Sequence, residues 1–312
     1  MDRRLITVFG GAGFIGRHIV WRLARDGWII RVAGRDRERA MFLKTSGDAG
    51  QIVPVAADVT HMASVQAAVV DADAVVNLVG VLSPSGRHSF DAVHAQGAAN
   101  IAAAARDAGS ERLIQFSAIG ASSSSESVYA RTKAAGEQAA RSAFPDVAIL
   151  RPSVVFGPED RFFNRFASMA RIMPVLPTFE SKVQPVYVGD VADAVMRVLA
   201  DPSTRGKTYE LGGPRVMTYR DIMEIVLKET GRRRWLVPLP LSIAAIQGWF
   251  LEKLPSPPLT RDQVRLLGID NVVSAAALGL KDLNISPTAV EAIVPTYLAN
   301  YQPPAKQSLR GL

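Results

Sequence analysis

Tyr129 and Lys133 stand four residues apart in the segment YARTK, within an alanine-rich stretch that predicts a helix. Residues four apart lie on one face of a helix, so the phenol and the ammonium group point to the same side. Such a lysine lowers the pKa of the phenol from about 10 and lets the tyrosine donate or remove a substrate proton. A lysine there also hydrogen-bonds the ribose of a nucleotide. The pair therefore indicates a cofactor pocket, with both residues as candidate catalytic groups.

A glycine-rich loop, GGAGFIG at residues 10–16, supplies a second kind of chemistry. Its glycines at positions 10, 13 and 16 let the backbone turn tightly and approach a pyrophosphate, whose charge then lies at a helix N-terminus. The apolar run LITVFG precedes the loop and the helical run FIGRHIVWRLARDG follows it. This order of strand, loop and helix is the context that a dinucleotide-binding loop requires.

The choice of nicotinamide cofactor depends on the end of the second predicted strand. A site for NAD(H) places a carboxylate there to bind the ribose 2′-hydroxyl, whereas this chain has Gly34 followed by Arg35. Arg17 directly follows the last glycine of the loop, and arginine pairs with phosphate through a planar fork. NADP(H) is therefore favoured. NAD(H) stays open, because Asp36 could rotate inward and restore the carboxylate.

The elements that must position these residues alternate along the first half of the chain. Strands are expected at 5–10, 28–34, 51–59, 72–80, 112–120 and 147–157, and helices at 14–27, 63–72, 91–109 and 129–144. Apolar strands that alternate with helices form a parallel sheet covered on both faces. We therefore predict an α/β fold, a Rossmann-type doubly wound parallel sheet, with a small C-terminal annex.

Two regions are expected. Residues 1–157 form the NAD(P)-binding Rossmann core, and residues 158–312 form a smaller C-terminal region with the last sheet elements and an annex over the cleft. This second region is predicted to hold a strand and helix within 184–202, a short strand at 209–213, and a helix at 218–231 that Thr218 caps.

Composition excludes several classes of site. The chain has no cysteine, and its four histidines, at positions 18, 61, 88 and 94, lack the spacing of metal ligands. We expect no metal, and treat these histidines as ordinary surface or loop residues. The formal charge of +7 favours phosphates, acidic partners or an anionic membrane face. No basic stripe interleaved with aromatic residues indicates a nucleic-acid partner, and the N-terminal MDRRLITVFGG lacks the pattern of a secretory signal.

Together these motifs resemble the atypical or extended short-chain dehydrogenase/reductase (SDR) superfamily, also called the NAD-dependent epimerase/dehydratase superfamily. The resemblance covers about residues 4–230 and is carried by GGAGFIG (10–16), DV (58–59), NLVG (77–80), YARTK (129–133), LRPSVVFGP (150–158), YVGDVADAV (187–195) and YELGGP (209–214). Within it, the chain most resembles the SDR-like, NADPH-binding accessory subunits of respiratory complex I (NADH:ubiquinone oxidoreductase) and their alphaproteobacterial relatives. That closer resemblance rests on FSAIGA, RPSVVFGPED, FFNRF, QPVYVGDVADAV, YELGGP and PLTRDQVRLL with DNVVS.

The resemblance also implies where the cofactor would lie. The cofactor-binding positions it implies are Gly10, Gly13, Phe14, Ile15, Gly16 and Arg17 along the pyrophosphate, Arg35 at the 2′-phosphate, Asp58 and Val59 at the adenine, Val79, Gly80 and Ser117 beside the ribose-nicotinamide half, Tyr129 and Lys133 at the ribose, and Pro152 and Val155 flanking the nicotinamide.

One catalytic hydroxyl is missing from the expected position. Working members of the superfamily place a serine or threonine at the end of the strand before the tyrosine, where it orients the substrate carbonyl. Here that strand ends in FSAI, and Ile119 takes the position. The loss of one preorganised donor costs on the order of 3 kcal/mol of transition-state stabilisation. The serines at 122–125 lie in a polar loop, which would preorganise a substitute poorly.

The segment RRRWLVPLPLSIAAIQGWFLEKL, at residues 232–254, has two interpretations. Its apolar part is too short to span a bilayer, which takes about 20 residues. It is either a buried helix of the annex, or an interfacial helix. In the second case Arg232–Arg234 would meet anionic lipid or an acidic subunit, and Trp235 and Trp249 would lie at the interface.

We therefore expect an NADPH-binding, SDR-like accessory or assembly protein of a membrane respiratory complex of the complex I type, with little or no catalysis. The alternative is an NADP-dependent reductase or epimerase acting on a hydrophobic carbonyl or on an intermediate of ubiquinone biosynthesis. The expected partners are NADPH and either subunits of the membrane complex or an anionic membrane surface. The expected location is cytoplasmic and peripheral to the inner membrane.

Overall fold

The computed structural model describes residues 4–84, 86–252, 254 and 259–303. The chain divides into two compact units, each discontinuous in sequence. The first unit comprises the described residues up to Pro152, together with Val191–Glu210 and Ala276–Ile285. The second unit comprises Ser153–Asp190, Leu211–Ala275 and the described residues from Ser286 onward.

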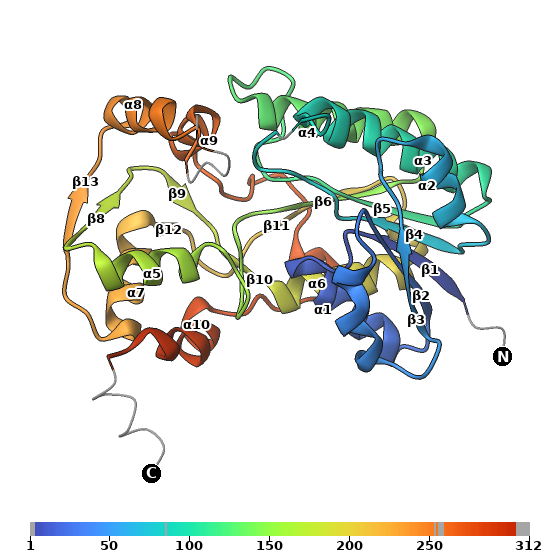
Figure 1. Cartoon of the computed structure of the whole chain (residues 1–312), viewed down its shortest axis with the longest axis horizontal. Helices are drawn as coiled ribbons and strands as arrows, with labels where there is room; N and C mark the ends of the chain where they lie inside the picture. The colour runs from blue at the N-terminus through green and yellow to red at the C-terminus, as the bar shows by residue number, and fades with distance from the viewer. Residues whose placement is uncertain (1–3, 85, 253, 255–258, 304–312) are drawn as a thin grey trace, which may run out of the picture. The chain divides into compact units, whose positions relative to one another are not determined.

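A seven-stranded sheet forms the centre of the first unit, in the order β11-β6-β5-β4-β1-β2-β3 (Figure 1). Its strands are β1 (Leu5–Phe9), β2 (Ile29–Gly34), β3 (Ile52–Ala56), β4 (Ala74–Asn77), β5 (Arg112–Phe116), β6 (Ala148–Pro152) and β11 (Thr208–Leu211). All pairs from β6 to β3 are parallel. The predicted α/β fold class is confirmed.

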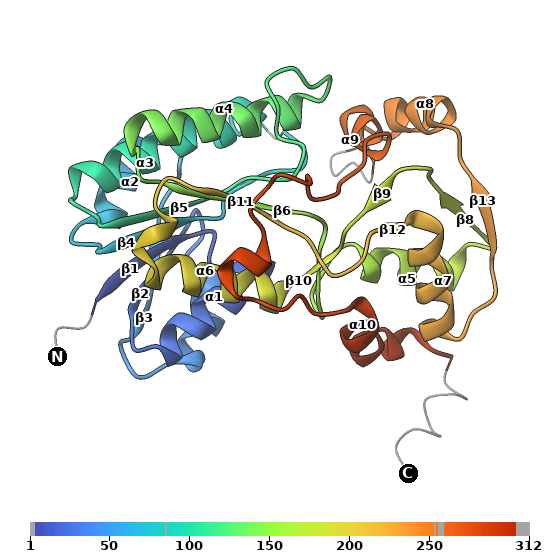
Figure 2. The same ribbon diagram turned by 180° about the vertical axis from the view of Figure 1, so that it is seen from behind.

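Helices cover both faces of this sheet, as Figures 1 and 2 show from opposite sides. One face carries α2 (Met62–Val69), α3 (Gly97–Asp107) and α4 (Val128–Ala143), and the other carries α1 (Phe14–Arg25) and α6 (Val188–Ala200). Short 3₁₀ helices complete the unit, and they are η1 (Glu38–Ser46), η3 (Pro202–Thr204) and η4 (Leu280–Leu283). Apolar side chains of both layers form the core, which includes Phe9, Val75, Ile101, Leu113 and Ile149.

Two expected elements are divided in the structure. The helix expected at 91–109 begins as a π-helix, η2 (Ala92–Gln96), before α3 starts at Gly97. The strand expected at 147–157 separates into β6 and β7 (Val155–Phe156). Pro152 ends β6, and proline has no N–H to donate to a neighbouring strand.

The second unit packs α5 (Phe163–Ile172), α7 (Tyr219–Thr230) and α10 (Val290–Leu298) around buried aromatic and aliphatic side chains such as Phe156, Phe163 and Ile222. Three two-stranded pairs join it: β10 (Val186–Tyr187) with β7, β12 (Met217–Thr218) with β9 (Lys182–Val183), and β13 (Trp235–Pro238) with β8 (Val175–Thr178). Its other helices are α8 (Leu241–Leu251), α9 (Arg261–Leu267) and η5 (Ala299–Tyr301).

The cap predicted at Thr218 is confirmed. Its Oγ1 accepts a hydrogen bond from Asp221 N at 3.1 Å, and the Asp221 carboxylate accepts one from Thr218 N at 2.8 Å. This reciprocal capping box satisfies two of the amides that the first turn of a helix leaves without partners. Lys253 and the prolines at positions 255, 257 and 258, which the sequence placed after the apolar segment, lie outside the described residues.

Candidate functional site

The glycine loop joins β1 to α1 and is fixed by backbone hydrogen bonds. Gly10 N donates to Ala33 O on β2, and Gly13 N donates to Gly10 O, both at 2.9 Å. Gly10 has a φ of +78°, in the left-handed region that favours glycine. The loop therefore has a defined turn that depends on Gly10.

Gly13 and Gly16 allow the loop and the helix to approach each other. A Cβ at Gly16 would lie 2.5 Å from both Gly10 O and Gly11 Cα, and a Cβ at Gly13 would lie 3.1 Å from Gly10 O. The first turn of α1 begins with Phe14 and Ile15, has Gly13 as its N-cap, and within the described chain has neither a side-chain cap nor an acidic residue. The amides at this helix N-terminus are therefore available to an anion.

Arg35 follows β2 and is exposed, as are its neighbours Asp36 and Arg37. The Asp36 side chain points along the chain: its Oδ1 accepts from Glu38 N at 3.0 Å, and its Oδ2 lies 3.5 Å from Arg39 Nε. Asp36, which precedes the N-cap Arg37, thus binds the first amide of η1. The guanidinium of Arg17 lies 5.1 Å from the centre of the Phe42 ring.

Asp58 lies just after β3, and each of its carboxylate oxygens is hydrogen-bonded. Oδ1 accepts from Thr60 N at 3.0 Å and from Thr60 Oγ1 at 2.7 Å, and Oδ2 lies 3.0 Å from His88 Nε2. Partial burial opposes ionisation, but the Thr60 and His88 hydrogen bonds outweigh it and lower the pKa of Asp58 to about 2. The neighbouring Val59 is buried, and its carbonyl accepts from Asn100 Nδ2 at 2.8 Å.

The loop after β4 reaches Lys133 on α4. Asn77 Oδ1 accepts from Val79 N at 3.0 Å and shapes the turn. A Cβ at Gly80 would lie 3.3 Å from Lys133 Nζ and 3.6 Å from His94 Nε2. The structure therefore brings together Val79, Gly80 and Lys133, which the sequence assigned to the same half of the cofactor.

His94 joins this loop to the helix that carries the tyrosine and lysine. Its Nε2 accepts from Val81 N at 3.0 Å, so its Nδ1 carries the proton and donates to Thr132 Oγ1, also at 3.0 Å. Thr132 Oγ1 in turn donates to Tyr129 O at 3.0 Å. Burial, together with the charge of Lys133, lowers the pKa of His94 to about 3.

His94 corrects one sequence expectation, because it is buried and bridges two elements rather than lying on the surface or in a loop. Its spacing carries no signal of this role.

Lys133 and Tyr129 lie on α4 with Lys133 Nζ 6.0 Å from the centre of the tyrosine ring. Lys133 is buried, and its Nζ donates to Phe116 O at 3.3 Å. Burial lowers the pKa of Lys133 to about 8, partly offset by the Glu137 carboxylate. Burial also raises the pKa of Tyr129 to about 12, so the phenol stays protonated at neutral pH. An acid–base tyrosine would need the opposite shift.

The hydroxyl that would complete a catalytic set is absent from the strand end. Ile119 is buried there, and its N donates to Pro152 O at 3.2 Å. Ser117 N donates to Leu150 O at 2.8 Å, and its buried Oγ has no hydrogen-bond partner among the described residues.

The serine loop bonds mainly to itself. Ser122 Oγ lies 2.9 Å from Ser124 Oγ, and Ser125 Oγ accepts from Ser127 N at 3.2 Å. Arg131 fixes the loop further by donating to Ser125 O at 2.6 Å. These hydroxyls are therefore already engaged in turn contacts.

The two residues expected at the nicotinamide fall in different units. Pro152 is the last residue of β6 in the first unit, whereas Val155 pairs with Val186 in the β7–β10 pair of the second unit. All the other predicted site residues belong to the first unit.

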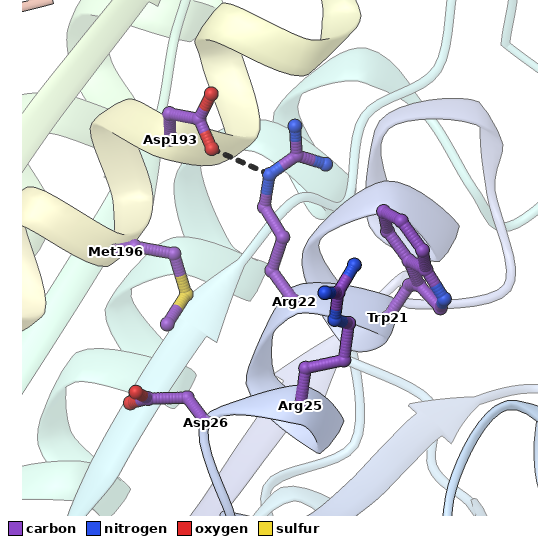
Figure 3. Close-up of a pocket in the computed structure, with 6 residues that line it drawn as sticks. All are labelled: Trp21, Arg22, Arg25, Asp26, Asp193 and Met196. Atoms are coloured by element: carbon purple, nitrogen blue, oxygen red, sulfur yellow. Dashed lines mark hydrogen bonds and ion pairs between the residues drawn. The ribbon is translucent and has the colours of Figure 1, made fainter.

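A hollow of about 440 Å³ lies at the C-terminal end of α1, far along the helix from the glycine loop (Figure 3). It is lined by Trp21, Arg22, Arg25, Asp26, Asp193 and Met196. Arg22 Nε pairs with Asp193 Oδ1 at 2.6 Å across the hollow. None of the predicted site residues lines it. Within the described part of the chain, no three His, Asp or Glu side chains group as a metal site would require.

Known proteins resemble this chain both in sequence and in fold. Residues 6–212 match the NAD dependent epimerase/dehydratase family. The chain is 36% identical to the mitochondrial NADH-ubiquinone oxidoreductase 40 kDa subunit of Neurospora crassa, over 97% of this chain and 83% of that protein. It is also 36% identical to the mitochondrial NADH dehydrogenase (ubiquinone) 1 alpha subcomplex subunit 9 of Arabidopsis thaliana, over 95% of this chain and 77% of that protein.

Among solved structures, MoeE5 in complex with UDP-glucose and NAD superposes with a TM-score of 0.71. The superposition covers 97% of this chain and 99% of MoeE5, at 17% sequence identity. At this identity the similarity is one of fold.

Proposed function

The chain belongs to the NAD dependent epimerase/dehydratase family, and from that premise we propose that it is a nucleotide-holding accessory subunit of a membrane respiratory complex of the complex I type. Its relatives from Neurospora crassa and Arabidopsis thaliana are named as subunits of NADH-ubiquinone oxidoreductase and NADH dehydrogenase, and the alignments span most of each protein. We place the protein at the periphery of the membrane, on the cytoplasmic side.

The first unit fits a nicotinamide dinucleotide. The glycine loop leaves the N-terminal amides of α1 available to the pyrophosphate, and Gly16 keeps that helix close to the loop. Lys133 and the buried hydroxyl of Ser117 supply donors for the ribose-nicotinamide half. A bound nicotinamide would supply hydride-transfer chemistry, and these residues of the first unit would hold it.

NADP(H) is the form that we propose. Arg35 is exposed at the end of β2, where its guanidinium is available to a 2′-phosphate. Asp36, the residue that would favour NAD(H), already accepts from Glu38 N and lies beside Arg39. Inward rotation of Asp36 would break its hydrogen bond from Glu38 N, which opposes the NAD(H) alternative.

The observation that carries the proposal combines two features. A buried isoleucine stands at position 119, where a catalytic hydroxyl is expected, while the glycine loop keeps the close approach to α1 that a nucleotide requires. Isoleucine cannot donate a hydrogen bond to a substrate carbonyl, and burial raises the pKa of the Tyr129 phenol, whereas acid–base catalysis needs it lowered. Binding groups are retained while two catalytic features are not. This combination favours a structural use of the nucleotide over turnover.

The test is to purify the protein gently from native membranes and to identify what accompanies it. We expect NADPH at about one per chain and co-purification with subunits of an NADH:ubiquinone oxidoreductase. The reductase or epimerase alternative predicts instead a free protein that oxidises NADPH with a carbonyl substrate. A protein that carries neither nucleotide nor respiratory subunits would contradict the proposal.

A further inference from the structure

Helix α8 in the second unit exposes most of its large apolar side chains. Only Ala244 and Gly248 are buried along it, where it packs against α9. Ile246 and Phe250 are each 61% exposed, and Trp249 is 42% exposed. The interpretation of this segment as a buried annex helix is therefore wrong for the described residues.

The exposed arc of α8 is broad. The exposed apolar residues of α8 follow one another around the helix in the order Leu241, Trp249, Ile246, Phe250 and Ile243. At about 100° per residue, they span an arc of about 200°. A helix that packs on one side against protein needs an apolar stripe of only about 100° or more. A fluid apolar medium, by contrast, contacts every exposed side of the helix at once.

The β8–β13 ribbon, which leads directly into α8, is also apolar on its exposed side. Trp235 pairs with Val175 in this ribbon, and the two side chains are 77% and 40% exposed. Ile172, at the end of α5 just before the ribbon, is 86% exposed. Figures 1 and 2 both show β13 running up to α8. We call α8 together with this ribbon the apolar face.

Basic side chains border the apolar face, although fewer than the sequence suggested. Arg232 donates to Tyr301 O at 3.2 Å and Arg234 donates to Ala170 O at 2.9 Å, so both fold back onto the unit. Arg233 and Arg171 are exposed beside the ribbon. These two arginines, and not the whole triplet, are available to anionic headgroups.

We propose that the apolar face lies in the headgroup region of an anionic lipid bilayer, with α8 parallel to the membrane. The eleven residues of α8 extend about 16 Å, against about 30 Å for the hydrocarbon core of a bilayer. Among the helices of the described residues, none is long and apolar enough to cross a membrane. Exposed tryptophans in both parts of the face, Trp235 and Trp249, and the two flanking arginines suit the headgroup region of an anionic bilayer.

This inference deepens the proposed function by naming lipid as a partner of the second unit, but it stands on separate residues. Nucleotide binding depends on the first unit, whereas the apolar face lies in the second. A protein that fails to bind lipid yet holds NADPH with respiratory subunits would contradict this inference alone.

The experiment is flotation of the purified full chain with protein-free vesicles. One set contains phosphatidylcholine only, and the other contains 30 mol% (about one lipid in three) phosphatidylglycerol. We expect flotation with the anionic vesicles that falls as salt rises, because exposed charges are screened within about 8 Å at physiological ionic strength. Arg171→Gln with Arg233→Gln should weaken the partition coefficient about fivefold per arginine.

The apolar contribution is tested by Ile246→Glu with Phe250→Glu. Because both side chains are exposed, the fold should persist, and the partition coefficient should fall at least about tenfold per side chain. The matched control is Val70→Glu with Val216→Glu, which makes the same charge change at exposed apolar positions away from the face. Thermal stability and nucleotide content are measured on every variant.

Two results would overturn the inference. In the first, the folded wild type stays at the bottom of the gradient with both kinds of vesicle, which would assign the apolar face to a protein partner. In the second, the control variant loses as much flotation as the α8 variant, which would attribute the effect to net charge.

Discussion

Replacement of Gly16 by alanine tests whether the glycine loop is built for close approach. The new Cβ would lie 2.5 Å from Gly10 O and from Gly11 Cα, both backbone atoms. Ordinary contacts are about 3.4 Å or longer, so loop and helix must separate by close to 1 Å. Overpacking of this kind costs about 1–3 kcal/mol, against about 1 kcal/mol gained from the helix propensity of alanine. We expect a net loss of up to about 2 kcal/mol in the free energy of unfolding.

The larger effect of Gly16→Ala should be on nucleotide binding. A shifted loop loses backbone hydrogen bonds to the pyrophosphate, and one charge-assisted hydrogen bond is worth about 1.5–3 kcal/mol. Affinity should therefore fall at least about tenfold. Urea unfolding with and without NADPH measures both quantities, since a ligand at 100 times its Kd adds about 2.7 kcal/mol to stability.

Gly34→Ala is the matched control for stability. A Cβ there would meet no atom within 4 Å, so the same chemical change should leave the free energy of unfolding within about 1 kcal/mol of the wild type. If Gly16→Ala kept both the wild-type stability and the full increment from NADPH, the steric account of the loop would be refuted.

Three further predictions concern the cofactor half and the buried histidine. Arg35→Asp should weaken NADPH binding about tenfold or more while NADH binding improves, measured by titration calorimetry; equal affinities of the wild type for both nucleotides would refute the assignment of the 2′-phosphate to Arg35. Tyr129→Phe should leave NADPH retention within about threefold of the wild type, because the substitution keeps the aromatic ring and removes one neutral hydroxyl; loss of a cellular function with nucleotide still bound would indicate catalysis. The pKa of His94 is lowered to about 3 in the folded chain, whereas in the unfolded chain it is about 6.5. Between pH 6.5 and pH 3 the unfolded chain therefore binds the extra proton, and the free energy of unfolding should fall on acidification by up to about 1.4 kcal/mol per pH unit. Denaturant unfolding from pH 7 to 4.5 should show a shallower decline in His94→Gln than in the wild type, and parallel declines would contradict the assignment.

Local patterns in the sequence predicted the fold well. The order of strands and helices, the glycine loop, and the Thr218 cap are each encoded by residues close together in the chain, where periodicity and capping rules apply. Element ends were less accurate. The division of the strand at 147–157 depends on a proline at its centre and on which unit each half joins.

Features set by distant residues could not be predicted from the sequence. The bridge from His94 to Val81 and Thr132 joins segments up to 38 residues apart. The pKa of Tyr129 depends on burial, which its spacing from Lys133 does not reveal. Asp36 could have turned either way until the hydrogen bond to Glu38 N was known.

Exposure of α8 was the hardest feature to predict. A short helix that is apolar on all sides has the same sequence pattern whether it lies in a core or on a surface. The structure resolves the two interpretations because the buried residues of α8 are the small Ala244 and Gly248, whereas Ile246 and Phe250 are each 61% exposed. Likewise, two of the three arginines at 232–234 bond to backbone carbonyls, which no charge count reveals.

The most direct test of the central claim is to follow the nucleotide in the purified protein over time. The chain is isolated with its endogenous nucleotide, which is quantified by mass spectrometry before and after incubation with quinones and hydrophobic carbonyl compounds. The isoleucine at position 119 predicts about one NADPH per chain that remains bound and reduced throughout. Oxidation of the bound NADPH over repeated cycles with any of these acceptors would contradict the account and establish the protein as a working reductase.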